Sequence, residues 1–170
     1  MSIEKQTVEL LKSKKLKLAT AESCTGGLIS KRITDVSGSS EVFEGGVVCY
    51  SNRFKENVLG VSRETLKKYG AVSRETAREM VKGVLSLTKA DIAVAVTGIA
   101  GPSSDDTNKP VGLVYIAVSD GKSTIVKKLL NNFTGDVREQ NRSISADTAL
   151  EMIMAVSYTH LRAHETVLDL

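Results

Sequence analysis

The stretch Ala21-Glu22-Ser23-Cys24-Thr25-Gly26-Gly27 joins a predicted strand to a predicted helix. Apolar residues alternate along residues 16–21, which is typical of a strand, and the apolar segment from Leu28 onward begins a helix. The two glycines allow positive φ and the close approach of a ligand, and the helix N-terminus behind them favours negative charge. The turn is therefore expected to hold a phosphate, to stabilise an oxyanion or to present a nucleophile.

Strands and helices alternate along the rest of the chain. Helical spacing and helix-start residues predict helices at 2–13, 28–35 and 53–59, from Ser62, from Ser73, and after Gly135. Apolar runs predict strands at 16–21, 43–50, 91–96, 111–118 and 123–130, the last two joined by an Asp-Gly hairpin. This order predicts an α/β fold, a three-layer α/β/α domain around a mixed sheet. Ligands bind such sheets at the carboxyl ends of strands, so segments 21–27, 50–55 and 97–102 are expected to meet in one cleft.

Length and composition bound the domain count. With 170 residues, 41% of them hydrophobic, the chain is expected to form one domain, which we place at residues 1–156. Residues 157–170 break the apolar pattern of the last helix and are interpreted as a tail outside that domain.

Composition also limits the cellular compartments and the binding partners that we expect. The apolar runs are far shorter than the ~20 residues of a membrane span, and two cysteines are too few for a disulfide framework, so we expect a cytoplasmic protein without membrane contact. The formal charge of +3 and the absence of Trp argue against direct nucleic-acid binding. Adjacent Asp105 and Asp106 are weak evidence for Mg²⁺, so neither a metal nor a cofactor is expected.

Ser23 is the first candidate nucleophile, because a strand-to-helix turn can expose its hydroxyl beside N–H groups that would face an oxyanion. The alternative is that Ser23 caps the helix, and Cys24 is a rival nucleophile. Both histidines, His160 and His164, lie within the last eleven residues, so the base is sought elsewhere. Lys55, one short turn after Tyr50, is the best candidate, and a solvated helix lysine is the alternative.

Two further groups could contact an anion. Thr97, Gly98 and Gly101 form a second glycine-bearing turn, which suits a phosphate or a sugar but is equally explained as a tight turn. Arg138 and Arg142 lie four residues apart near a helix start, where they could bind an anion or pair with neighbouring carboxylates.

Several ordered motifs resemble the CinA C-terminal domain family over about residues 5–156. The blocks are residues 20–27, residues 45–52 with Lys55, residues 70–73, residues 97–102, residues 109–112 and residues 133–136. The resemblance implies a stand-alone form of this module and the activity of a nicotinamide-nucleotide amidase, which hydrolyses the carboxamide of nicotinamide mononucleotide to nicotinate mononucleotide and ammonia. The family pattern places an arginine directly after Gly-Asp, whereas Val137 intervenes here.

Carried over by motif, the resemblance implies that Ser23 is the nucleophile, Lys55 its base and Tyr50 an auxiliary group. We expect a small-molecule nucleotide as substrate and a homo-oligomer, dimeric or larger. The alternative functions are a non-catalytic nucleotide-binding or competence- and DNA-repair-associated interaction module, and an amidase for another pyridine or purine amide. The residues expected to bind substrate are Thr25, Gly26, Thr97, Gly98, Gly101 and Arg142.

Overall fold

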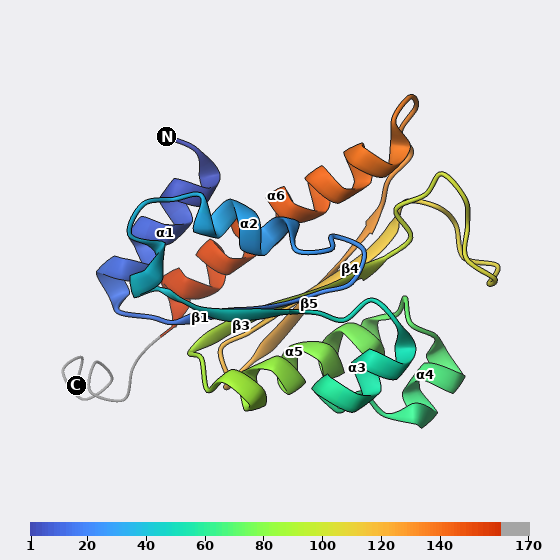
Figure 1. The fold of residues 1–170 in the computed structure, drawn as a ribbon, viewed down its shortest axis with the longest axis horizontal. Helices are drawn as coiled ribbons and strands as arrows, with labels where there is room; N and C mark the ends of the chain where they lie inside the picture. Colours follow the sequence, from blue (N-terminus) through green and yellow to red (C-terminus); the bar gives the residue numbers. More distant parts are fainter. Residues whose placement is uncertain (161–170) are drawn as a thin grey trace.

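A computed structural model gives the fold of the chain and describes residues 1–160 (Figure 1). The five strands of its sheet are β1 (Leu18–Glu22), β2 (Phe43–Val48), β3 (Ile92–Gly98), β4 (Leu113–Ser119) and β5 (Thr124–Leu130). The helices are α1 (Ile3–Lys14), α2 (Leu28–Thr34), α3 (Asn52–Leu59), α4 (Arg63–Tyr69), α5 (Arg74–Thr88), α6 (Val137–Thr159) and the short 3₁₀ helix η1 (Ser39–Glu41). Within residues 1–160, no helix is long and apolar enough to cross a membrane.

The sheet is mixed and its strand order is β2-β1-β3-β4-β5. Strands β2, β1 and β3 run parallel, whereas β4 and β5 are antiparallel to their neighbours. Helices α1, α2 and α6 cover one face of the sheet, and α3, α4 and α5 cover the other (Figure 1). The predicted three-layer α/β/α domain is therefore confirmed.

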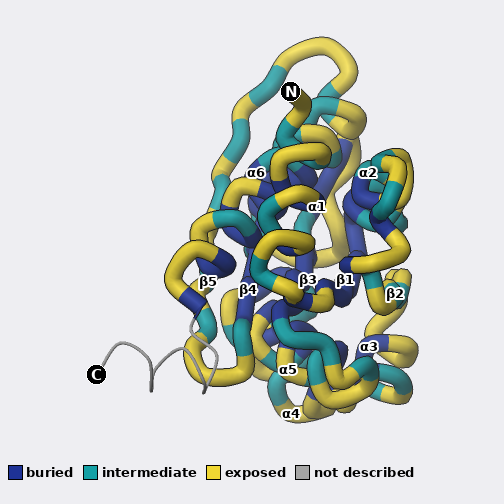
Figure 2. Tube along the Cα trace, turned by 90° about the vertical axis from the view of Figure 1, so that its left-hand side faces the viewer, coloured by how far each residue is buried: buried dark blue, intermediate teal, exposed yellow. Residues whose placement is uncertain are grey.

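Side-chain alternation along β1 sends successive residues into different layers. Leu18 packs in the apolar cluster that includes residues of α1, α2 and α6. Ala19 and Ala21 pack in the second cluster, with residues of α3 and α5. The central strands are accordingly buried on both faces, as the dark segments of Figure 2 show. The same alternation places Glu22 on the α2 side and Ser23 on the α3 side.

The first strand begins two residues later than predicted because a helix cap and two hydrogen bonds of backbone N–H groups occupy the approach to it. Lys15 ends α1 in the left-handed conformation, with φ 57°, and the N–H of Leu16 returns to the carbonyl of Leu11. The N–H of Lys17 donates to the Asp91 carboxylate at 2.7 Å. Helix starts were easier to predict, since Ser62 and Ser73 both cap their helices as expected.

Helix α6 continues to Thr159, beyond the boundary that the sequence suggested at residue 156. His160 follows it and is buried, with Nδ1 3.2 Å from a carboxylate oxygen of Asp120. The rest of the predicted tail, His164 included, lies outside the described residues.

Candidate active site

Ser23 directly follows β1, at the carboxyl end of an inner strand of the sheet. Its N–H donates to the carbonyl of Val96 at 2.9 Å, which fixes the residue beside the end of β3. The alternation along β1 directs its hydroxyl toward α3, and the residue is 7% exposed. The nucleophile candidate is thus held by strand pairing on a nearly buried face that opens into a cavity.

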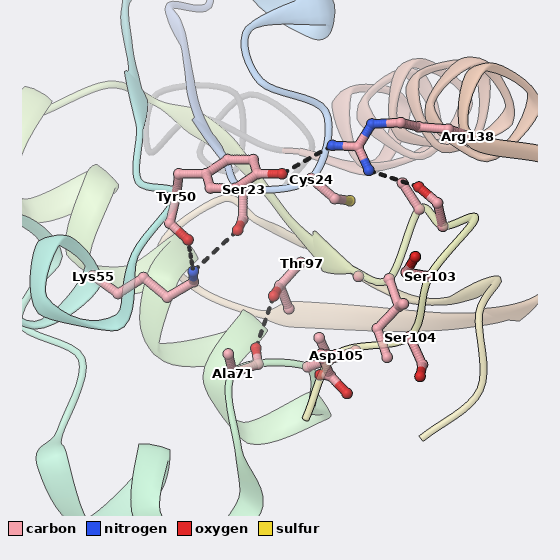
Figure 3. Close-up of a pocket in the computed structure, with 15 residues that line it drawn as sticks. Ser23, Cys24, Tyr50, Lys55, Ala71, Thr97, Ser103, Ser104, Asp105 and Arg138 are labelled. Carbon is pink, nitrogen blue, oxygen red and sulfur yellow. Dashed lines mark hydrogen bonds between the residues drawn. The ribbon is translucent and has the colours of Figure 1, made fainter. Parts of the chain in front are cut away.

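Lys55 reaches Ser23 from the first turn of α3. Its Nζ lies 3.0 Å from Ser23 Oγ and 3.1 Å from the backbone oxygen of Tyr50 (Figure 3). Helix α3 begins at this point because Ser51 caps it, accepting a hydrogen bond from the N–H of Phe54. The cap therefore sets the start of the helix that presents the lysine.

Burial changes the chemistry of Lys55. The side chain is 1% exposed, and desolvation lowers the pKa of its ammonium below the ordinary value of 10.5, because the charged form loses its hydration. In the part of the chain that the structure describes, no carboxylate forms an ion pair with Lys55. The alternative of a solvated helix lysine is wrong, and a buried amine of lowered pKa suits a general base.

The structure argues against Cys24 as the nucleophile. Burial raises the pKa of its thiol to about 12, and burial also raises the pKa of Cys49 to about 11. A thiol with so high a pKa carries almost no thiolate at neutral pH, and the thiolate is the reactive form. Cys24 lines the cavity beside Ser23 as an inert neighbour.

Ser23 does not cap the helix that follows the turn. The N-cap of α2 is Gly27, which has no side chain to accept a hydrogen bond. The N–H groups of Ile29 and Ser30 donate instead to the carboxylate of Glu22, at 2.8 and 3.0 Å, and Ser30 Oγ donates to it at 2.7 Å. The hydroxyl of Ser23 is therefore left for Lys55, and the negative charge expected at this helix start is supplied by Glu22.

Glu22 was missed at the sequence level. Glu22 immediately precedes Ser23, and it is fully buried although its side chain is ionisable. The sequence does carry a sign of this role: Glu22 is an acidic residue in a strand of small and apolar residues, and the strand ends shortly before a helix.

The three segments expected to converge do so around a cavity of about 240 Å³. Ser23, Lys55 and Tyr50 line it together with Thr97, Gly98 and Gly101, as the sequence predicted. Further lining that the sequence did not assign to the site comes from the turn before α5, from the loop after Gly101 and from the start of α6: Ala71, Val72, Ser103, Ser104, Asp105 and Arg138.

Packing explains the residues of the glycine-bearing turn at the end of β3. A Cβ on Gly98 would lie 2.9 Å from the backbone oxygen of Leu113, so only glycine fits between β3 and β4 there. Thr97 is buried, and its hydroxyl donates to the carbonyl of Ala71 at 2.7 Å, which leaves oxygen lone pairs as acceptors (Figure 3). Close packing alone explains Gly98, while Thr97 holds together two segments that line the cavity.

Thr25, Gly26 and Arg142 do not line the cavity that contains Ser23. Thr25 is fully buried. Arg142 donates from Nε to the carbonyl of Cys24 at 3.2 Å and from a terminal nitrogen to the carbonyl of Thr25 at 2.9 Å. In this structure Arg142 therefore holds the turn, and it also lines a neighbouring pocket together with Arg138.

Arg138 is the arginine that lies at the cavity. Its guanidinium donates to the carbonyl of Gly101 at 2.7 Å and to the phenolic oxygen of Tyr50 at 3.0 Å (Figure 3). The Tyr50 side chain is 60% exposed, and its phenol lies with Arg138 while its backbone oxygen contacts Lys55. Arg138 was considered from the sequence but not assigned to the site.

Neither acidic clusters nor imidazole take part in this geometry. Over residues 1–160, no group of three or more His, Cys, Asp or Glu side chains is arranged to hold a metal ion. Asp105 lines the cavity, but its carboxylate accepts from the backbone N–H and the hydroxyl of Thr107. His160 contacts Asp120 beside the start of β3, at the opposite end of the sheet from Ser23.

Comparisons with known proteins agree on one family. The family model of the CinA C-terminal domain matches residues 1–157. A CinA-like protein of Thermotoga maritima is 50% identical over 149 residues, and one of Syntrophomonas wolfei is 53% identical over 137 residues, covering 88% and 81% of this chain. The chain spans about a third of the length of such curated relatives, 36% and 32% for these two.

Solved structures give the same assignment. The competence/damage inducible protein CihA from Agrobacterium tumefaciens superposes with a TM-score of 0.82 at 40% identity, over 91% of this chain and 96% of that one. A CinA superfamily protein from Klebsiella pneumoniae has a TM-score of 0.87 at 31% identity, over 93% and 97% of the two chains.

Proposed function

Because this chain belongs to the CinA C-terminal domain family, we propose that it is a serine–lysine amidase that hydrolyses the carboxamide of nicotinamide mononucleotide. The observation that carries the proposal is the 3.0 Å contact between Ser23 Oγ and a buried Lys55 Nζ of lowered pKa. A cap or a surface lysine would need neither this contact nor this burial, whereas a nucleophile and its base need both.

In the proposed reaction, neutral Lys55 accepts the proton of the Ser23 hydroxyl as Oγ bonds to the carboxamide carbon. The resulting tetrahedral oxyanion collapses, the C–N bond breaks, and the lysine ammonium returns the proton to the leaving nitrogen, which departs as ammonia. Water then attacks the ester carbon and Lys55 accepts a proton from it. The C–O bond to Ser23 breaks, the lysine ammonium returns the proton to Ser23 Oγ, and the carboxylic acid is released with Ser23 and Lys55 restored.

The oxyanion would be received by backbone N–H groups of the turn. The N–H of Ser23 already donates to Val96, and that of Gly26 donates to the carbonyl of Ser23 at 3.1 Å. Among residues 1–160, no backbone carbonyl accepts from the N–H of Cys24 or Thr25. Because Thr25 is fully buried and does not line the cavity, the N–H of Cys24 is our candidate oxyanion donor, in place of the wider set that the sequence allowed.

The nucleotide phosphate would meet Arg138. A guanidinium binds phosphate through a planar pair of N–H donors, and Arg138 is exposed where the cavity reaches the surface. The pyridine carboxamide would then lie deeper, between Ser23 and the turn of Thr97 and Gly98. The assignment of Arg142 to substrate binding, made from the sequence, is replaced in this proposal by Arg138.

The name of the solved relative from Agrobacterium tumefaciens, a competence/damage inducible protein, favours a second candidate, a competence- or DNA-repair-associated interaction module without turnover. The two functions differ in their demand on Lys55: a binding module has no use for a buried amine of lowered pKa beside a serine. Turnover by the intact chain distinguishes the candidates directly.

The test is ammonia release from nicotinamide mononucleotide, run beside nicotinamide and nicotinamide adenine dinucleotide. We expect turnover of the mononucleotide and a loss of several powers of ten, ~10³-fold or more, in Ser23→Ala and in Lys55→Arg, whose guanidinium keeps the charge but cannot accept a proton. The exposed Ser86→Ala serves as the matched control. Near-normal rates in either site variant contradict the mechanism, and tight binding without turnover by the unaltered protein contradicts the amidase.

A further inference from the structure

Thr97 is the residue that the sheet places directly beside Ser23. The N–H of Ser23 donates to the carbonyl of Val96, which continues the parallel pairing of β1 with β3 and makes Thr97 the next register partner of Ser23. Register partners on neighbouring parallel strands lie about 4.8 Å apart and point to the same face of the sheet. The two hydroxyls are therefore neighbours on the face that α3 and α5 cover, and both residues line the cavity.

The hydroxyl of Thr97 has a fixed hydrogen-bonding polarity. It donates its single proton to the carbonyl of Ala71 at 2.7 Å, and a carbonyl oxygen can only accept (Figure 3). Within residues 1–160, no group donates to the Thr97 oxygen, although the residue is buried. Because a hydroxyl oxygen carries two lone pairs, Thr97 presents an acceptor beside the nucleophile and has no proton left to donate.

We propose that Thr97 is a specificity-determining residue, whose oxygen accepts an N–H of the primary carboxamide and so selects carboxamides over carboxylates. A carboxamide presents two N–H donors, whereas a carboxylate presents only oxygen lone pairs and a negative charge. A fixed acceptor therefore favours the substrate and disfavours the acid that the reaction forms. The inference rests on the proposed amidase function and deepens it by stating how the site distinguishes substrate from product.

The same acceptor decides which way the carboxamide faces. The oxygen and the nitrogen of this group differ little in size, so shape alone would allow two orientations related by a half-turn. With the nitrogen on Thr97, the carbonyl oxygen is left for the N–H of Cys24, the candidate oxyanion donor. With the group reversed, two acceptors would meet at Thr97 and two donors at Cys24, and both hydrogen bonds would be lost. Thr97 thus favours the orientation that can react.

Thr76 makes the same kind of hydrogen bond away from the cavity. It is fully buried, and its hydroxyl donates to the carbonyl of Gly70 at 2.7 Å, in the turn that Thr97 also contacts. Thr76 does not line the cavity that contains Ser23. The structural effect of losing one such bond should therefore appear in Thr76→Val as well, whereas a changed ligand preference should appear only in Thr97→Val.

The test is calorimetric titration of the Ser23→Ala protein, which lacks the nucleophile, with nicotinamide mononucleotide and nicotinate mononucleotide. The two ligands differ only in carboxamide against carboxylate. We expect added Thr97→Val to lower the preference for the amide, measured as the ratio of the two dissociation constants, by about tenfold or more, because valine keeps the shape and removes the acceptor. Added Thr97→Ser or Thr76→Val should keep this ratio within about threefold, although Thr76→Val should lower Tm.

Turnover gives a second readout in the chain that keeps Ser23. The methyl ester of nicotinate mononucleotide has no N–H, so Thr97→Val should lower kcat/KM for the amide by about tenfold or more without lowering it for the ester. An equal fall on amide and ester, or an unchanged ratio of dissociation constants, overturns the inference and leaves the amidase in place. If the unaltered protein releases no ammonia, a ratio that still falls in Thr97→Val supports the inference while the proposed turnover fails. Binding of neither ligand together with turnover of neither substrate overturns it.

Discussion

Replacing Lys55 with methionine should abolish turnover and make the protein more stable. The side chain is 1% exposed and donates to only two oxygens, at 3.0 and 3.1 Å, and no carboxylate among the described residues pairs with it. Methionine keeps most of the buried volume and removes the amine. A base that evolution placed in an unfavourable environment should show this opposition between activity and stability.

Two opposing contributions set the change in the free energy of unfolding on replacing Lys55 with methionine. The two hydrogen bonds to uncharged oxygens contribute about 1 kcal/mol each, whereas removing the charged form of the lysine from water without a carboxylate partner costs several kcal/mol. We therefore expect a net gain of about 1–3 kcal/mol in the free energy of unfolding at neutral pH. For a chain of this size each kcal/mol moves Tm by roughly 2–4 °C, so Tm should rise by about 2–10 °C.

The stability that Lys55→Met gains over the unaltered protein should decrease as the pH rises. Because the folded-state pKa of Lys55 lies below 10.5, the unfolded chain binds more protons than the native chain between those two values. The stability contribution of Lys55 is thus most unfavourable below the folded pKa and rises with pH through the window. The advantage of Lys55→Met should be largest at low pH and should shrink by up to about 1.4 kcal/mol per pH unit inside the window.

The assay is chemical unfolding of both proteins at several pH values between neutral and 10, with ammonia release measured in parallel. Lys127→Met, an exposed lysine on β5, is the control, and its stability difference should be small and independent of pH. A less stable Lys55→Met protein, or a stability difference that does not change with pH, would refute the description of Lys55 as a desolvated base.

Three further substitutions test the surroundings of the base. Tyr50→Phe should lower kcat by less than about tenfold, because its phenol holds Arg138 and the contact to the base is through the backbone; steady-state kinetics measure this. Gly98→Ala should destabilise by about 1–3 kcal/mol in thermal unfolding, since its Cβ would meet the oxygen of Leu113 at 2.9 Å. Cys24→Ala should keep activity within about threefold, and iodoacetamide should not inactivate the unaltered enzyme, because the thiol pKa is about 12.

The fold and the proximity of Ser23 and Lys55 could be predicted from the sequence because they follow from short sequence patterns and from the topology that those patterns imply. Apolar runs alternating with capped helices indicate a layered sheet, and the carboxyl ends of parallel strands meet at one edge, which brought Ser23 and Lys55 together. The absence of a histidine early in the chain then directed attention to Lys55. The family and the three-layer fold are confirmed, while the catalytic roles remain predictions.

The supporting residues could not be anticipated, since their roles depend on how helices are placed. Arg138 and Arg142 lie on one face of α6, and only the position of that helix decides that the first reaches the cavity and the second reaches the turn. Glu22 reads as an exposed strand residue until α2 presents its N–H groups to the carboxylate. Each is a contact between distant elements that no local pattern encodes.

The place of β2 at one edge of the sheet bears on how the proposed activity would be lost. This strand pairs only with β1 on one side, and it leads directly to α3, which carries the base. Edge elements open at lower free energy than central strands, so we expect fraying of this segment to separate Lys55 from Ser23 while the apolar clusters remain intact. Loss of function would then precede melting, and a sample that still gives the circular dichroism of a folded protein could contain a large inactive fraction.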